Sequence, residues 1–133
     1  MSVLLDLKTL LDSESVGPAF IGRRLDPPEQ PDAGIWLQTY VGDPNRLLDG
    51  DNLPADERLA VQVMARAQQH DQFAAETLAH QAFRALSTRH VSVNGREYAW
   101  VRANHYPAYI GVDENDRPLV VCNFTARRRG LTP

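Results

Sequence analysis

The sequence has one cysteine, a small net charge and no long apolar run, and each of these features excludes a class of protein. Cys122 is the single cysteine among 133 residues, so no intrachain disulfide can form, and its apolar neighbours predict a small buried side chain. This cysteine use fits a reducing compartment. The formal net charge of −3 does not draw the whole chain to nucleic acid or anionic lipid, so any basic function must be local.

Segments for export and for membrane insertion are also missing. The N-terminus lacks the basic stretch and the long apolar stretch of a signal peptide. No run approaches the ~18 apolar residues that suggest a membrane helix. We therefore expect neither a signal peptide nor a membrane partner. The hydrophobic fraction of 43% and the charged fraction of 23% are ordinary for a folded globular protein.

The four histidines lack the spacing of a metal site. His70 and His80 are ten residues apart on or near one predicted helix, which puts them about 80° apart around its axis. His90 is expected at the start of a strand and His105 in a loop, with no ligand-like spacing between any pair. Surface or half-buried histidines are the better interpretation, and no metal or cofactor is expected.

The acidic run 113–116 does not match a calcium loop. That template needs glycine at its sixth place and glutamate at its twelfth, which here hold Pro118 and Phe124. A solvated hairpin turn is the better interpretation. A second acidic group consists of Asp43, Asp49, Asp51 and Asp56. Magnesium binding is an alternative for this group, although polar loops are commonly acidic without binding a metal. Without a glycine–serine elbow or a phosphate-binding glycine loop, and with Cys122 in mid-strand, the chain is predicted not to be an enzyme.

Apolar periodicity predicts two helices. The first is capped by Ser2 and ends within 13–17, with Asp6 outside its apolar stripe. That stripe consists of Val3, Leu4, Leu7, Leu10 and Leu11. The second helix runs from a cap at Asp71 to about Ser87. Its apolar positions are Ala75, Leu78, Ala79, Ala82, Phe83 and Leu86, and the many alanines suggest that it lies close on a sheet.

Strands are predicted between and after these helices. A short extended segment covers 18–22, and residues 35–41 follow as a strand. Residues 58–66 alternate cleanly between apolar and polar side chains. A hairpin joins 109–112 to 118–126, and the largely apolar faces of its second strand predict a central or covered position in the sheet.

Asn94-Gly95 predicts another hairpin, because a type I′ turn needs positive φ at both central residues. Regular pairing around this turn places Tyr98 and Trp100 on one face of the sheet and Val101 on the other.

The order of these elements predicts an α+β fold with a mostly antiparallel sheet. We expect two helices packed on one face of the sheet and the order α-β-β-β-α-β-β-β-β. Residues 1–133 are expected to form a single domain, in which 127–133 are a flexible basic tail.

Several segments are candidates for contacts with a partner. The loop Arg23–Gly34 contains three prolines, and the loop Gly42–Asp56 has 15 residues without periodicity. Arg127–Arg129 suit phosphates or an acidic partner surface, and a frayed, solvated terminus is the alternative. Trp36 and Tyr40 share a strand face and indicate either an interface patch or core packing under a helix.

Patterns along most of the chain carry a resemblance to a known family. They include the N-terminal leucine helix, Phe20-Ile21-Gly22, and the segments 33–37 and 59–67. The densest stretch is Pro107–Leu119, followed by Asn123-Phe124. In these patterns the chain resembles the minor capsid, or tail terminator, proteins of long-tailed bacteriophages, which are related in fold to the tail terminators of siphophages.

That resemblance implies a non-enzymatic structural subunit. It would form a ring, typically a hexamer, that caps the completed tail tube and joins it to the head-completion connector. The implied partners are further copies of the chain, the tail tube protein and the connector protein, with DNA only in the lumen. The implied location is the head-proximal end of the tail in the virion, and the host cytoplasm during assembly. Asp116 departs from the family, which often has glycine in that position of the turn.

We expect the interfaces of such a ring to involve Asp43, Asn45, Arg46, Asp49, Asp51, Arg127, Arg128 and Arg129. The alternative function is a nucleic-acid-binding module that uses the C-terminal arginine cluster. A small enzyme or ligand-binding α+β domain is a third class, which the missing site residues disfavour.

Overall fold

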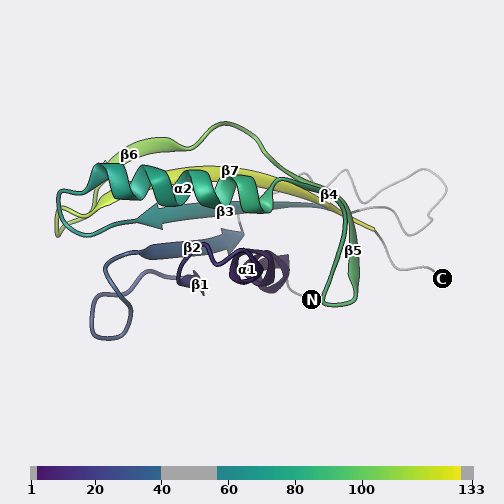
Figure 1. Ribbon diagram of the computed structural model, residues 1–133, viewed down its shortest axis with the longest axis horizontal. Helices are drawn as coiled ribbons and strands as arrows, with labels where there is room; N and C mark the ends of the chain where they lie inside the picture. Colours follow the sequence, from purple (N-terminus) through teal and green to yellow (C-terminus); the bar gives the residue numbers. More distant parts are fainter. Residues whose placement is uncertain (1–2, 40–56, 130–133) are drawn as a thin grey trace.

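The computed structural model describes residues 3–39 and 57–129 of the chain, and in them two helices cover one face of a seven-stranded sheet (Figure 1). The elements are α1 (Val3–Ser13), β1 (Ala19–Ile21), β2 (Gly34–Thr39), β3 (Glu57–Arg66), α2 (Gln72–Leu86), β4 (Thr88–Val93), β5 (Arg96–Ala103), β6 (Ala108–Val112) and β7 (Pro118–Arg128). The predicted α+β class and the predicted order of elements are confirmed.

β7 is the central strand of the sheet. The strand order is β1-β2-β3-β7-β5-β4, and β6 pairs with β7 beside this path. On one side β7 pairs with β3 from Leu119 to Arg128, and on its other side it pairs first with β6 and then with β5. Only the β1–β2 pair is parallel among the described pairs. Leu119, Val120 and Val121 are all buried, so both faces of β7 are covered near its start, which explains their apolar side chains.

The core lies between the helices and the concave face of the sheet. Alternation along β7 directs one set of side chains to the helices, and these are paired with matching positions on β3. The buried side chains of this face include Ile35, Leu37, Val61, Val63, Cys122, Phe124 and Ala126. Leu7 and Leu11 of α1 and Leu86 of α2 complete the cluster and are fully buried.

α2 begins at the predicted cap, because the side chain of Asp71 accepts a hydrogen bond of 3.1 Å from the backbone N–H of Ala74. Ala75, Ala79 and Ala82 face the sheet and are buried. Their small side chains let the helix approach closely, so α2 lies along β3 and β7 (Figure 1). None of the helices in the described ranges is long and apolar enough to cross a membrane.

The turns of the two hairpins contain residues with positive φ. Asn94 and Gly95 have φ of 52° and 80°, as the predicted type I′ turn requires. Asp116, in the β6–β7 turn, has φ of 59°, a conformation that glycine adopts without steric cost. The aspartate therefore occupies the turn that the resembled family often builds with glycine.

The face assignment predicted for the Asn94-Gly95 hairpin is wrong. The register between β5 and β7 shifts between Tyr98 and Trp100, so Ala99 is an extra residue on β5. This bulge turns Tyr98 to the helix side, where it is 1% exposed, on the same side as the buried Val101. Trp100 lies on the opposite face, and the β4–β5 hairpin curls towards α1 (Figure 1).

Candidate functional site

The site residues predicted from the sequence fall into two groups. Asp43, Asn45, Arg46, Asp49 and Asp51 lie outside the residues that the structure describes, as does Tyr40. The three C-terminal arginines lie inside them. Trp36 is 2% exposed and stacks on Phe20 with ring centroids 5.2 Å apart, so it packs within the protein and is not an interface patch.

The C-terminal arginines continue β7, and the expected flexible tail does not begin at Arg127. Arg127 pairs with Arg58 of β3 and with Trp100 of β5, and Arg128 belongs to the same strand. The backbone N–H of Arg129 still donates a 2.9 Å hydrogen bond to the carbonyl of Glu97. Because side chains alternate along a strand, Arg127 points away from the helices and Arg128 lies on their side, opposite Tyr98.

Arg127 belongs to a larger basic surface, which we call the arginine face. It consists of Arg58, Arg89, Trp100, Arg102 and Arg127 on the side of the sheet opposite the helices. The guanidinium carbon of Arg102 lies 3.9 Å from the centroid of the Trp100 ring, which orients this cation by a cation–π contact. Arg58, Arg89 and Arg102 are exposed, and Arg127 is half-buried. The sequence alone identifies only the consecutive arginines Arg127–Arg129 at this end of the molecule. Arg58, Arg89 and Arg102 are far from them in the sequence and become their neighbours only through strand pairing.

The opposite end of β7 holds two buried arginines. Arg66, 2% exposed, donates from Nε to the carbonyl of Asp32 at 2.7 Å and from Nη2 to the carbonyls of Pro31 at 2.8 Å and Leu25 at 3.0 Å. Its guanidinium also lies 4.4 Å from the ring centroid of Trp36. These contacts fasten the proline-rich loop to the sheet, so the loop has a defined surface despite its lack of regular structure.

Arg117 is the second buried arginine of this end. Its Nε donates to Asp113 at 2.9 Å, its Nη1 to Asp32 at 3.0 Å, and its Nη2 to Asp26. Burial raises the pKa of Asp113, but backbone N–H bonds and the charge of Arg117 outweigh it, so the pKa is lowered. Asp113 and Arg117 are therefore charged together at neutral pH.

A group of exposed carboxylates surrounds this buried pair, and we call it the acidic tip. It consists of Asp26, Glu29, Asp32, Glu114 and Asp116. The side chains of Asp26 and Asp32 remain 64% and 50% exposed although both contact Arg117. The two segments that form the tip, 23–33 and 113–117, carry one exposed cation, Arg23. The acidic tip is therefore the negative counterpart of the arginine face at the other end of β7.

A buried network at the arginine-face end fastens the β4–β5 hairpin to α1. Asp6 is 0% exposed and accepts hydrogen bonds from Arg96 Nε at 2.6 Å, from Asn94 Nδ2 at 2.9 Å, and from the Tyr98 hydroxyl. Burial raises the pKa of Asp6, but the hydrogen bonds that it accepts outweigh burial and lower the pKa. Burial and the neighbouring Asp6 also raise the pKa of the Tyr98 hydroxyl.

The prediction that Asp6 lies outside the apolar stripe of the first helix is wrong. Asp6 is buried, and it stands three residues after Val3 and four before Leu10, so it borders the apolar stripe of α1.

β6 and the segment before it present an apolar edge. It is formed by Tyr106, Tyr109, Ile110 and Val112, which are 75%, 44%, 53% and 50% exposed. Among the described strands β6 pairs only with β7, so its other edge has no strand partner there. Tyr106 stacks on Phe83 of α2 with ring centroids 5.5 Å apart. Exposed apolar side chains along an open strand edge suit a protein partner.

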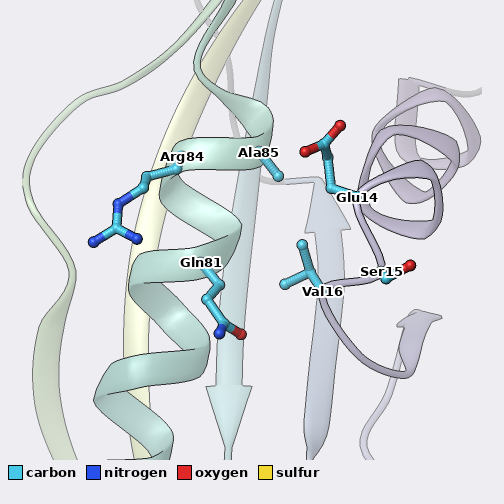
Figure 2. Close-up of a pocket in the computed structure, with 6 residues that line it drawn as sticks. All are labelled: Glu14, Ser15, Val16, Gln81, Arg84 and Ala85. Atoms are coloured by element: carbon cyan, nitrogen blue, oxygen red, sulfur yellow. The ribbon is translucent and has the colours of Figure 1, made fainter.

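One pocket of about 260 Å³ lies between the end of α1 and α2, lined by Glu14, Ser15, Val16, Gln81, Arg84 and Ala85 (Figure 2). Figure 2 shows Arg84 extending away from Glu14, and Ser15 pointing away from α2. Cys122 is buried, its thiol donates to the carbonyl of His105 at 3.2 Å, and burial raises its pKa to about 11. No group of three His, Cys, Asp or Glu suited to a metal ion occurs in 3–39 and 57–129.

Comparison with known proteins identifies the family. A family model described as "Bacteriophage tail terminator protein" matches residues 4–129. Among solved structures, a chain of the "Virion of native gene transfer agent (GTA) particle" has a similar fold, with a TM-score of 0.70 and 12% sequence identity. The match covers 97% of this chain and 96% of that one. No curated protein sequence matches.

Proposed function

The chain belongs to the bacteriophage tail terminator family, and from this premise we propose that it forms a ring that caps the tail tube. The family is one of structural proteins of the phage virion. In the proposed role the ring, a hexamer, covers the head-proximal end of the completed tube and joins it to the connector. Its partners are further copies of the chain, the tail tube protein and the connector protein.

The family match over residues 4–129 is the observation that carries this proposal, since it spans the helices and strands of the whole described fold. The surfaces of the chain are consistent with the role. A subunit in a ring needs two different contact surfaces for its neighbours, and this chain has separate acidic, basic and apolar surfaces. We assign the apolar edge on β6 to the contact with the tube or the connector.

Electron microscopy of mixtures tests the proposal. The purified chain is added to tail tubes that lack a terminator, and the products are examined by negative staining and light scattering. We expect rings at one end of each tube and attachment of connectors to those ends. A chain that remains monomeric and never joins a tube would contradict the proposal.

A deletion tests the loop residues of the interface hypothesis, including Asp43, Asn45, Arg46, Asp49 and Asp51. Removal of residues 43–56 is expected to prevent ring assembly or tail joining. Unchanged assembly after this deletion would exclude the loop from the contacts.

The arginine face favours nucleic-acid binding as a second candidate function. Arginines on neighbouring strands suit phosphates, and each neutralised phosphate adds salt dependence to the affinity. If the chain binds DNA in this way, affinity falls steeply with salt, and replacing Arg127, Arg128 and Arg129 with alanine reduces both the affinity and the salt slope. Binding that is unchanged in this variant would exclude the C-terminal arginines.

A further inference from the structure

We propose that the arginine face receives the acidic tip of a second copy of the chain, so that neighbouring subunits contact each other head to tail. This inference rests on the proposed ring function and names the surfaces that form the contact between subunits. Three features of the structure carry it: the arrangement of the arginines, the rigidity of the acidic tip, and the distance between the two surfaces.

The arginine face contains a row of side chains at one level of the sheet. Its members are successive pairing partners on the neighbouring strands β3, β7, β5 and β4: Arg58, Arg127, Trp100 and Arg89. With about 4.8 Å between strands, the row extends for ~14 Å. Arg102 stands over Trp100 and adds a further cation. The guanidiniums of Arg58, Arg89 and Arg102 are exposed. Each is a planar fork that suits a carboxylate in a two-bond contact, so these three can engage several carboxylates of one partner.

Carboxylates are scarce on these four strands. Among their described side chains, Glu97 is the one acid, and its side chain is 69% exposed. It lies 3.7 Å from Arg129, which directly follows β7. The arginine face therefore carries an excess of positive charge in a chain whose formal net charge is −3. A partner with fixed negative charge complements it.

The acidic tip is such a partner, because its backbone is held in place. Arg66 binds three carbonyls of the loop that carries Asp26, Glu29 and Asp32. Arg117 ties this loop to the β6–β7 turn, which carries Glu114 and Asp116. Binding to a preorganised surface costs less conformational entropy than binding to a flexible loop.

The two surfaces cannot neutralise each other within one molecule. They lie at opposite ends of the β3–β7 ladder, which runs from Arg66↔Leu119 to Glu57↔Arg128. Ten residues of strand separate these ends, a distance of ~30 Å. Contact is therefore possible only between copies. Because the two surfaces differ, the contact is heterologous, and repetition of one rotation closes a ring or extends a helix.

A second copy fits the arginine face better than a nucleic acid does. A row of ~14 Å spans only a few strand positions, whereas tight non-specific DNA binding needs many phosphate contacts. The negative net charge and the acidic tip also repel a polyanion. DNA binding to this face is an outcome that the test below detects.

Charge reversal on each surface tests the contact. Arg58→Glu with Arg89→Glu reverses the charge at two positions of the arginine face, and Glu29→Lys with Glu114→Lys reverses it at two positions of the tip. All four side chains are exposed, and in the structure none of them neutralises a buried charge. Each double variant alone should cap at least tenfold fewer tubes than the unmodified chain, because like charges then meet at the substituted positions of every contact between subunits.

Mixing the two double variants provides the rescue. In the mixture a reversed face meets a reversed tip and an unmodified face meets an unmodified tip, so opposite charges meet again at the substituted positions. Subunits then alternate around a ring with an even number of members. The chain with all four substitutions should also recover capping. Lys8→Glu with Arg84→Glu, which changes the net charge equally on the helical side, is the matched control and should cap normally. Circular dichroism checks folding, and Arg58→Gln with Arg89→Gln replaces the reversal if that variant does not fold.

The outcomes separate the two proposals. An unmodified chain that never caps a tube contradicts the ring function. Normal capping by both double variants contradicts the head-to-tail contact alone, as does a loss that neither mixing nor the fourfold variant restores. Rings that persist in the Arg58→Glu and Arg89→Glu variant, together with loss of salt-dependent binding to a DNA duplex, would reassign the arginine face to nucleic acid.

Discussion

Arginines occupy both ends of the long strand pair β3–β7, and the two ends use them differently. At the acidic end, Arg66 and Arg117 are 2% and 4% exposed and hold the loop and the turn together. At the other end, Arg58 and Arg89 are exposed on the open face of the sheet. A buried guanidinium must satisfy its donors inside the fold, so it stabilises the chain, whereas an exposed one keeps its donors for water or a partner. The environment of each arginine, and not its residue type, decides its role.

Loss of a buried arginine should have the largest effect. Arg117→Ala removes the 2.9 Å partner of Asp113, whose side chain is 10% exposed, and leaves it Arg66 at 4.0 Å. We expect the free energy of unfolding to fall by about 3 kcal/mol, because a buried carboxylate then loses its close, hydrogen-bonded cation. Urea denaturation at neutral pH measures this change. A loss below about 1 kcal/mol would show that Arg117 does not stabilise the loop and the turn that form the acidic tip.

Loss of the buried charge of Asp6 should have the next largest effect. Asp6 lies at the same end of the β3–β7 pair as the arginine face. Asp6→Asn removes the charge that Arg96, Asn94 and Tyr98 surround, and should lower the free energy of unfolding by about 2 kcal/mol. Asp12→Asn is the matched control, because the side chain of Asp12 is 50% exposed in its pair with Lys8. That control should lose less than about 0.5 kcal/mol. Equal losses in both variants would contradict the importance of burial.

Acid should destabilise both buried clusters. The pKa values of Asp6 and Asp113 are lowered in the folded chain, so their contribution to stability is present above the unfolded pKa and is lost as pH falls through the folded pKa. We expect the urea concentration at the unfolding midpoint to decrease when the pH is below about 4, where carboxylates of the unfolded chain take up protons. Asp6→Asn should show a shallower fall than the unmodified chain. Identical pH profiles would mean that Asp6 does not contribute.

The exposed arginines should give the smallest effect on stability. Arg58→Ala and Arg89→Ala should each change the free energy of unfolding by less than about 0.5 kcal/mol, because neither side chain is buried. The same urea experiment checks this, with Arg117→Ala as the contrasting variant. A loss of several kcal/mol would place these arginines among the structural ones and would weaken their assignment to a contact surface.

Local signals in the sequence predicted the elements well. Alanine spacing and the Asp71 cap predicted α2, alternation predicted β3, and Asn94-Gly95 predicted its turn. These features depend on residues within a few positions of each other, so the sequence contains the relevant information. The resemblance to tail terminators, confirmed by the family match, likewise depended on continuous segments such as 107–119.

Non-local features could not be predicted in the same way. The bulge at Ala99 reverses the direction of Tyr98, and no turn signal marks it. The ends of strands are equally ambiguous from the sequence. Arg127 looks like the start of a basic tail until β3 and β5 pair with it on both sides.

The sequence by itself determined the α+β class, the order of the elements, the turn at Asn94-Gly95 and the family. The tertiary structure decided which charges are buried and which are exposed: it placed Asp6, Arg66 and Arg117 inside, and it brought Arg58, Arg89 and Arg127 from three strands onto one face. The physical reason is that helix and turn formation depends on neighbours along the chain, whereas burial and charge pairing depend on contacts between residues that are far apart in it.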